Sequence, residues 1–164
     1  MLEALREKMA EILGRPAPVR RAPADPSRTE LPFVCEKTDW GPIYRSCQTL
    51  LPSHHVGRMP ADAASQASAQ MLALLSLDPL LGACDSGRAL YLDTETTGLG
   101  GGAGVVAFLV GLGWFDLDGR FVVEQLLLRK PSEEEPLLRF IADRIERASF
   151  VVTYNGKTFD WPLL

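Results

Sequence analysis

Short hydrophobic runs separated by turn-forming residues dominate the chain between residues 89 and 154. The runs 89–93, 105–115 and 121–128 are rich in leucine, valine and aromatic residues, as half-buried strands are. Residues 116–119 (DLDG) lie between the second and third runs and end in Asp-Gly, which is typical of a tight hairpin. The pattern therefore predicts three consecutive strands in an antiparallel meander.

A helix and a further strand are expected after the meander. Residues 131–135 (PSEEE) suit a helix start, because acidic side chains complement the positive end of the helix dipole. From there to about residue 147, apolar residues recur at helical spacing on one face: Leu137, Leu138, Ile141 and Ile145. The apolar run 150–154 is then reached through a helix, which is the connection that produces parallel pairing, and another helix is expected from Thr158. The order of elements predicts an α/β fold with a mixed sheet.

The N-terminal residues have a different character. Residues 1–14 place apolar side chains at roughly helical spacing among charged ones, which predicts a short amphipathic helix. Residues 15–32 contain repeated prolines, which lack the backbone N–H that helices and sheets use. We therefore expect residues 1–32 to form a helix followed by an extended linker.

The middle of the chain is less regular. In residues 33–59, short apolar stretches between glycines and prolines predict strands and turns. Residues 61–77 are rich in alanine, glutamine, leucine and methionine, which predicts a helix ended by Pro79, with Met71, Leu72 and Leu75 as its apolar stripe. We expect a mixed segment over residues 33–86 that precedes a domain beginning at residue 87.

Composition narrows the class of protein. The longest strongly apolar stretch without a charge, residues 104–115, is shorter than the roughly 20 residues that a membrane helix needs. The N-terminus lacks the apolar centre of a secretory signal, so a cytoplasmic protein without membrane association is expected. Cys35, Cys47 and Cys84 form no CxxC pair, which argues against a disulfide framework or a zinc ribbon. The formal net charge of −4 does not indicate nucleic-acid binding, so function must be argued from a site.

Two closely spaced acids are the strongest chemical signal. Asp93 and Glu95 are two residues apart, so in a strand their carboxylates share one face. Like charges this close disfavour mutual ionisation unless a cation offsets the repulsion. Oxygen ligands select Mg²⁺ or Mn²⁺, and two such ions about 4 Å apart can activate a water and stabilise the leaving oxygen of a phosphodiester. The pair therefore predicts a site for metal-dependent hydrolysis.

A third acid follows the expected parallel strand. Asp160 comes shortly after residues 150–154, and parallel strands present their carboxyl ends at the same edge of a sheet. We therefore expect Asp160 to converge with Asp93 and Glu95.

These acids lie in segments that resemble known motifs. Residues 93–99 (DTETTGL) resemble the first motif of the DEDD, or DnaQ-like, exonucleases, and residues 154–160 (YNGKTFD) resemble the second. The resemblance covers residues 89–164 and extends to the bacterial YprB-like proteins. It implies a ribonuclease-H-like fold. It also implies 3′→5′ exonuclease activity on single-stranded DNA or RNA with two Mg²⁺ or Mn²⁺ ions.

The resemblance also implies roles for individual residues. Asp93 would bridge both metals, Glu95 would bind the metal that generates the nucleophile, and Asp160 would hold the other metal. Three more polar residues of the motifs would lie near the substrate: Thr94, Thr96 and Asn155. The family also has a third motif, with a fourth Asp and a His or Tyr, which the sequence through Leu164 does not supply. The resemblance thus leads us to expect a domain truncated before that motif.

Other interpretations of the same residues remain. Residues 98–103 fit G-x-G-x-x-A, and Asp118 follows at the distance typical of a dinucleotide-binding fold. In such a fold, however, the glycine loop is followed by a helix, whereas residues 105–115 of this chain predict a strand. Asp160 alone would also suit a helix cap. A non-catalytic module that binds nucleic acid or protein is the rival function, because the third motif is missing.

Overall fold

The computed structural model describes residues 31–98, 104–154, 156 and 160–164. The expected N-terminal helix over residues 1–14 lies outside them, and so does the linker expected over residues 15–32 except for residues 31 and 32. By its contacts the chain divides into residues 1–31 and 32–164, and the fold described here is that of the second unit.

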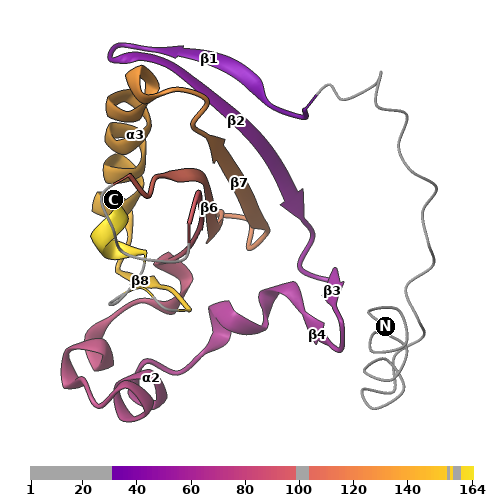
Figure 1. Cartoon of the computed structure of the whole chain (residues 1–164). Coiled ribbons are helices and arrows are strands. Elements are labelled where there is room, and N and C mark those ends of the chain that lie inside the picture. Colours follow the sequence, from indigo (N-terminus) through magenta and orange to yellow (C-terminus); the bar gives the residue numbers. More distant parts are fainter. Residues whose placement is uncertain (1–30, 99–103, 155, 157–159) are drawn as a thin grey trace, which may run out of the picture. The chain divides into compact units, whose positions relative to one another are not determined.

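The second unit contains strands, one long helix and several short helical turns (Figure 1). The strands are Val34–Thr38 (β1), Gly41–Leu50 (β2), His55–Val56 (β3), Met59–Pro60 (β4), Ala89–Thr96 (β5), Ala107–Phe115 (β6), Phe121–Leu127 (β7) and Phe150–Val152 (β8). The α-helices are Ala69–Ser76 (α2) and Glu134–Arg147 (α3), and the 3-10 helices are Ala61–Gln66 (η2), Pro79–Ala83 (η3), Ser86–Arg88 (η4), Pro131–Glu133 (η5) and Trp161–Leu163 (η6).

The predicted meander is confirmed. β6 pairs antiparallel with both β5 and β7, and residues 116–119 make the hairpin between β6 and β7. Asp116 Oδ1 accepts hydrogen bonds from the backbone N–H of Asp118 and of Arg120, each at 2.9 Å. Gly119 has a φ of 74°, a left-handed conformation that glycine adopts without steric cost. The local chemistry of the turn thus accounts for the pairing of the strands.

The predicted helix and parallel strand are also confirmed. α3 follows η5 and leads to β8, which pairs parallel with β5 through Ala89 opposite Phe150. The strand ends at Val152, two residues earlier than the sequence pattern indicated. The six-stranded sheet has the order β1-β2-β7-β6-β5-β8, so the mixed α/β fold expected from the sequence is present.

The sheet extends further upstream than expected. β2 pairs antiparallel with β7, from Arg45 opposite Leu126 to Leu50 opposite Phe121, and β1 pairs with β2. The strands of residues 34–50 thus belong to the sheet of the domain that was expected to begin at residue 87. Pairing with β2 satisfies the backbone groups along the edge of β7 that would otherwise be open.

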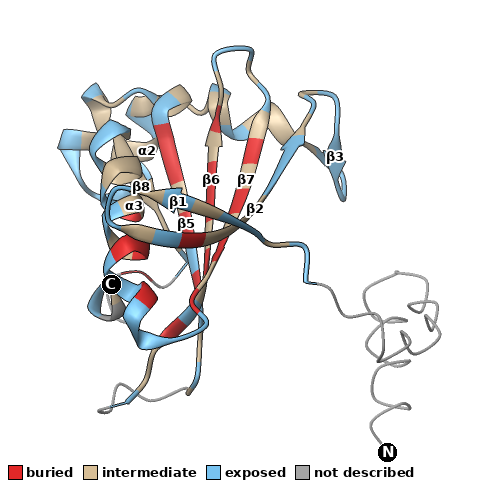
Figure 2. Ribbon diagram, turned by 90° about the horizontal axis from the view of Figure 1, so that it is seen from above, coloured by how far each residue is buried: buried red, intermediate tan, exposed pale blue. Residues whose placement is uncertain are grey.

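The core lies between one face of the sheet and α3. Figure 2 shows buried residues along β5, β6 and β7. The cluster consists of Leu90, Leu92, Ala107, Val110, Leu112, Leu126, Leu128, Leu137 and Ile141. Because burying each leucine-sized or isoleucine-sized side chain contributes roughly 1.5–3 kcal/mol, this interface fixes α3 against the central strands.

A buried ion cluster ties β2 and α3 to β7. Glu124 of β7 is fully buried, with none of its surface exposed. Its Oε1 accepts from Arg45 of β2 at 2.5 Å, and its Oε2 accepts from Arg144 of α3 at 3.2 Å. The hydrogen bond to Glu124 raises the pKa of the Arg45 guanidinium, so this arginine stays charged. The cluster joins three elements that are distant in sequence.

The prediction of one continuous helix over residues 61–77 is wrong, because the structure has two separate short helices there. η2 ends at Gln66, and Ser68 starts α2 by accepting a hydrogen bond from the backbone N–H of Met71 at 3.4 Å. The cap favours a new helix start at Ser68 over continuation. The expected apolar stripe is not buried either, since α2 and η3 expose a leucine-rich surface: Met71, Leu74, Leu75, Leu77 and Leu80.

The C-terminal helix expected from Thr158 is described only in part. Residues 157–159 lie outside the described residues, and after them the chain forms the 3-10 helix η6.

Within the described ranges, no helix has the length and apolar character needed to cross a membrane.

Candidate metal centre

The first four residues of the first motif, residues 93–96, lie inside a strand. β5 runs through Asp93 to Thr96, beyond the end at residue 93 that the sequence pattern indicated. Leu92 and Thr94 are buried, whereas Asp93 and Glu95 are exposed, so the two acids project from the sheet face opposite the core. The structure thus places the two carboxylates on the same face, as predicted.

The strand next to the pair leaves space beside it. Asp93 lies opposite Gly111 of β6, which has no side chain, and a register shift follows at Glu95 and Thr96. A hollow of about 730 Å³ on this face includes Asp93 and Gly111, together with Thr153 and Tyr154 after β8. Tyr154 is fully exposed. Asp93 therefore faces a surface that a ligand can reach.

Asp160 occupies a different position. Its Oδ1 accepts a hydrogen bond of 2.6 Å from the hydroxyl of Thr94, and both residues are buried. Because Thr94 points to the face opposite Asp93 and Glu95, the Asp160 carboxylate lies on the core side of β5. Across the described residues, no group of three or more His, Cys, Asp or Glu side chains is placed to hold a metal ion. The structure brings two of the three predicted ligands together.

The threonines of the motif are engaged within the protein. Thr96 Oγ1 donates to the carbonyl of Gly98 at 2.7 Å. Thr97 Oγ1 accepts from the backbone N–H of Val106 at 3.1 Å, and Thr97 N–H donates to the Val106 carbonyl at 3.1 Å. These bonds hold the ends of β5 and β6 together on both sides of the glycine-rich loop. Residues 99–103 of this loop, and the predicted substrate-contacting Asn155, lie outside the described residues.

The donor set fits a hard divalent cation in part. Magnesium is usually held by one or two carboxylates, with water and substrate phosphates as its other ligands. Asp93 and Glu95 provide two exposed carboxylates on one face, which meets that requirement for one ion. A second ion that depends on Asp160 does not fit this arrangement, because that carboxylate is bonded to Thr94.

Comparison with known proteins agrees with this topology. Residues 90–164 match the family described as the RNase_H superfamily. The sheet, which is mostly antiparallel with one parallel pair, is consistent with the ribonuclease-H-like fold of that family. The fold of this superfamily is a nuclease-type fold.

A relative in Bacillus subtilis (strain 168) is the uncharacterized protein YprB, which is 50% identical over 72 residues. The shared region covers 44% of this chain and 17% of YprB, so the chain spans less than a fifth of the length of that relative. No solved structure matches the chain.

The partner of Asp160 was missed by sequence reasoning. Strand alternation alone assigns Thr94 to the face opposite Asp93, and this signal was available in the motif. Sequence reasoning placed Thr94 near the substrate instead. The position of Asp160 depends on where the chain turns after β8, which no local pattern indicates.

Proposed function

We propose that this chain carries the first two motifs of a divalent-metal-dependent 3′→5′ exonuclease that acts on single-stranded DNA or RNA. The observation that supports the proposal is the pair Asp93 and Glu95, exposed on one face of β5 within a ribonuclease-H-like region. A domain gains nothing in stability from two like charges side by side on one face of a strand, whereas a bound cation offsets their repulsion.

The residues around the pair have distinct tasks in this proposal. Asp93 and Glu95 hold Mg²⁺ or Mn²⁺, and the bound metal supplies an activated water and stabilisation of the leaving oxygen. Gly111 keeps the space beside Asp93 open for the substrate. Tyr154 offers an exposed ring at the edge of the same hollow, where a terminal base can stack.

Asp160 enters the proposal as the third acid on the strength of its motif. To join the pair it has to give up the hydrogen bond from Thr94 and reach the other side of β5. The two-ion mechanism therefore depends on a rearrangement of Asp160, whereas binding of one ion by Asp93 and Glu95 does not.

Cleavage and metal binding test the proposal separately. End-labelled single-stranded DNA and RNA are incubated with Mn²⁺, Mg²⁺ or EDTA, and Mn²⁺ binding is followed by calorimetry. The variant Asp93→Asn removes one proposed ligand, and Asp118→Asn is the matched control because it changes an exposed carboxylate in the hairpin turn. We expect Asp93→Asn to lower Mn²⁺ affinity at least tenfold and to abolish shortening from the 3′ end, while Asp118→Asn leaves both unchanged.

Two results would count against the exonuclease. One is cleavage that continues in EDTA or in the Asp93→Asn variant. The other is Mn²⁺ affinity that responds equally to Asp93→Asn and Asp118→Asn.

A non-catalytic module that binds nucleic acid is the second candidate. The separation of Asp160 from the pair favours it, because only part of the metal-binding set is assembled in the described residues. In that case the chain binds single strands in the presence of EDTA and never shortens them, and Asp93→Asn leaves the affinity for the strand unaltered.

A further inference from the structure

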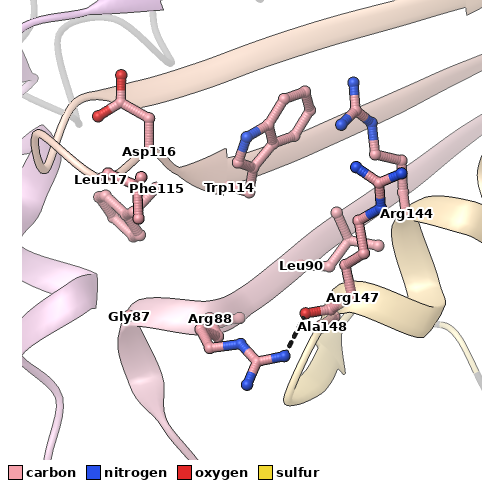
Figure 3. A pocket seen from close by; sticks show the side chains of 11 residues that line it. Gly87, Arg88, Leu90, Trp114, Phe115, Asp116, Leu117, Arg144, Arg147 and Ala148 are labelled. Carbon is pink, nitrogen blue, oxygen red and sulfur yellow. Dashed lines mark hydrogen bonds between the residues drawn. The ribbon is translucent and has the colours of Figure 1, made fainter.

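A second cavity lies at the other end of β5. It has a volume of about 440 Å³ and is bounded by η4, the start of β5, the end of β6 and the last turn of α3 (Figure 3). Leu90 lines it from the core side of β5, whereas Asp93, three residues further along the strand and roughly 10 Å away, projects from the opposite face. The cavity is therefore separate from the candidate metal centre.

The wall of the cavity provides a flat aromatic surface. Trp114 of β6 lines it and is only partly buried. The guanidinium of Arg144 lies over the Trp114 ring, 4.4 Å from its centroid, which is a cation–π arrangement. Leu117 and Ala148 add apolar surface at the edge. Arg144 therefore covers one face of the indole, and a planar ring that enters the cavity can contact only the part of Trp114 that Arg144 leaves open.

Three arginines surround the same space: Arg88, Arg144 and Arg147 (Figure 3). Arg88 donates to the carbonyl of Arg147 at 2.7 Å, and Arg147 pairs with Asp143 at 2.8 Å. Arg144 also donates to Glu124 at 3.2 Å. A guanidinium has five N–H donors, so Arg88 and Arg147 retain donors for a ligand. The Nε of Arg144 is buried and has no hydrogen-bond partner among the described residues.

The acid that lines the cavity does not cancel this excess of donors. Asp116 Oδ1 already accepts from two backbone N–H groups of the hairpin, at 2.9 Å each. Arg144 and Arg147 form ion pairs with Glu124 and Asp143, so the cavity offers arginine donors and not a large net positive charge. Arginine is the side chain best suited to phosphate, because its donors match two phosphate oxygens at once.

A purely structural explanation covers only part of this arrangement. Arg144 and Arg147 lie in the last turn of α3, where positive charge complements the helix dipole. That explanation extends to Arg88 of η4, whose guanidinium bonds the carbonyl of Arg147 at the end of α3, but it does not include the aromatic surface of Trp114. Residues from separate elements converge on one space of a size typical of small-molecule sites, roughly 300–1,000 Å³.

We propose that this cavity binds a nucleoside phosphate, with the base against Trp114 and the phosphate between Arg88 and Arg147. The proposal does not depend on the exonuclease, because it involves neither Asp93 nor Glu95 and needs no divalent cation. A free nucleotide and the 5′-phosphorylated end of a nucleic acid share this chemistry.

Binding is tested by calorimetry in EDTA with AMP, adenosine, inorganic phosphate and a 5′-phosphorylated dinucleotide. We expect AMP to bind more tightly than adenosine or inorganic phosphate, since each of these lacks one half of the ligand. The variant Arg88→Ala should weaken AMP binding tenfold or more, and Arg147→Gln should have a similar effect. The control Arg139→Ala removes another arginine of α3, outside this cavity, and should leave the affinity unchanged.

Fluorescence gives a second measurement in the same cavity. In a background with Trp40→Phe and Trp161→Phe, AMP should quench the emission of Trp114. The proposal fails if AMP does not bind at millimolar concentration, or if Arg88→Ala and Arg147→Gln bind it as tightly as Arg139→Ala. Equal affinity for AMP and inorganic phosphate overturns the role of Trp114. Tighter binding of the dinucleotide than of AMP identifies a nucleic-acid end as the source of the phosphate.

Discussion

Glu124 offers a direct test of how the upstream strands are held to the domain. Its carboxylate is completely buried and bonds Arg45 of β2 and Arg144 of α3. The variant Glu124→Ala removes the negative charge and leaves both guanidiniums without it. Removing one partner of a buried ion pair costs about 3–5 kcal/mol, because the remaining charge is uncompensated.

The expected loss lies near the lower end of that range. The side chain of Arg45 is 32% exposed and that of Arg144 is 23% exposed, so water compensates part of the lost interaction. Arg45 also keeps its ion pair with Glu36 of β1. We therefore expect Glu124→Ala to lower the free energy of unfolding by about 3 kcal/mol.

Urea unfolding followed by far-UV circular dichroism measures this loss. The matched control is Glu36→Ala, which removes the other carboxylate on Arg45, and this carboxylate is 42% exposed. An exposed pair is worth about 1 kcal/mol or less. If Glu124→Ala costs no more than Glu36→Ala, the buried cluster does not hold β2 and α3 to β7, and this reasoning is refuted.

Three further variants test other parts of the fold. Thr94→Val removes the hydroxyl that bonds Asp160 and leaves a buried carboxylate without that donor, so we expect a loss of about 1–3 kcal/mol in urea unfolding. The hydrogen bond from Arg129 lowers the pKa of Glu133 below its ordinary value of 4.5. The ionised Glu133 therefore stabilises the fold fully above pH 4.5, and this contribution is lost as the pH falls through the lowered pKa. The fall in melting temperature on acidification should accordingly be smaller in Glu133→Gln than in the wild type. Gly119→Ala places a Cβ at a φ of 74° with no atom within 4 Å, so backbone strain alone should cost about 1–2 kcal/mol, measured by urea unfolding.

Local patterns in the sequence account for the centre of the fold. The Asp-Gly turn at residues 116–119, the helical spacing in α3 and the crossover to β8 all depend on residues close in sequence. The pairing of β2 with β7 is different, because Arg45 and Glu124 are 79 positions apart and neither strand indicates its partner. The division of residues 61–77 into two short helices was not predicted either, because the Ser68 cap interrupts a continuous run of good helix formers.

The candidate site divides in the same way. The shared face of Asp93 and Glu95 follows from the period of two along a strand, and the structure agrees. The position of Asp160 does not follow from any period, because it depends on a turn after β8 and on the buried hydroxyl of Thr94. A motif identifies which side chains belong to a site, but packing determines which of them meet.

The exposed leucines of α2 and η3 affect how this protein is assayed. Dyes such as ANS are used to detect partly unfolded states, because they fluoresce on exposed apolar surface. Here the folded chain already presents Leu74, Leu75, Leu77 and Leu80 to solvent. Dye emission from the native protein should therefore be high. The Leu75→Glu variant should give lower dye emission than the wild type. For this chain, a bright dye signal marks an intact helix surface and not a loss of tertiary structure.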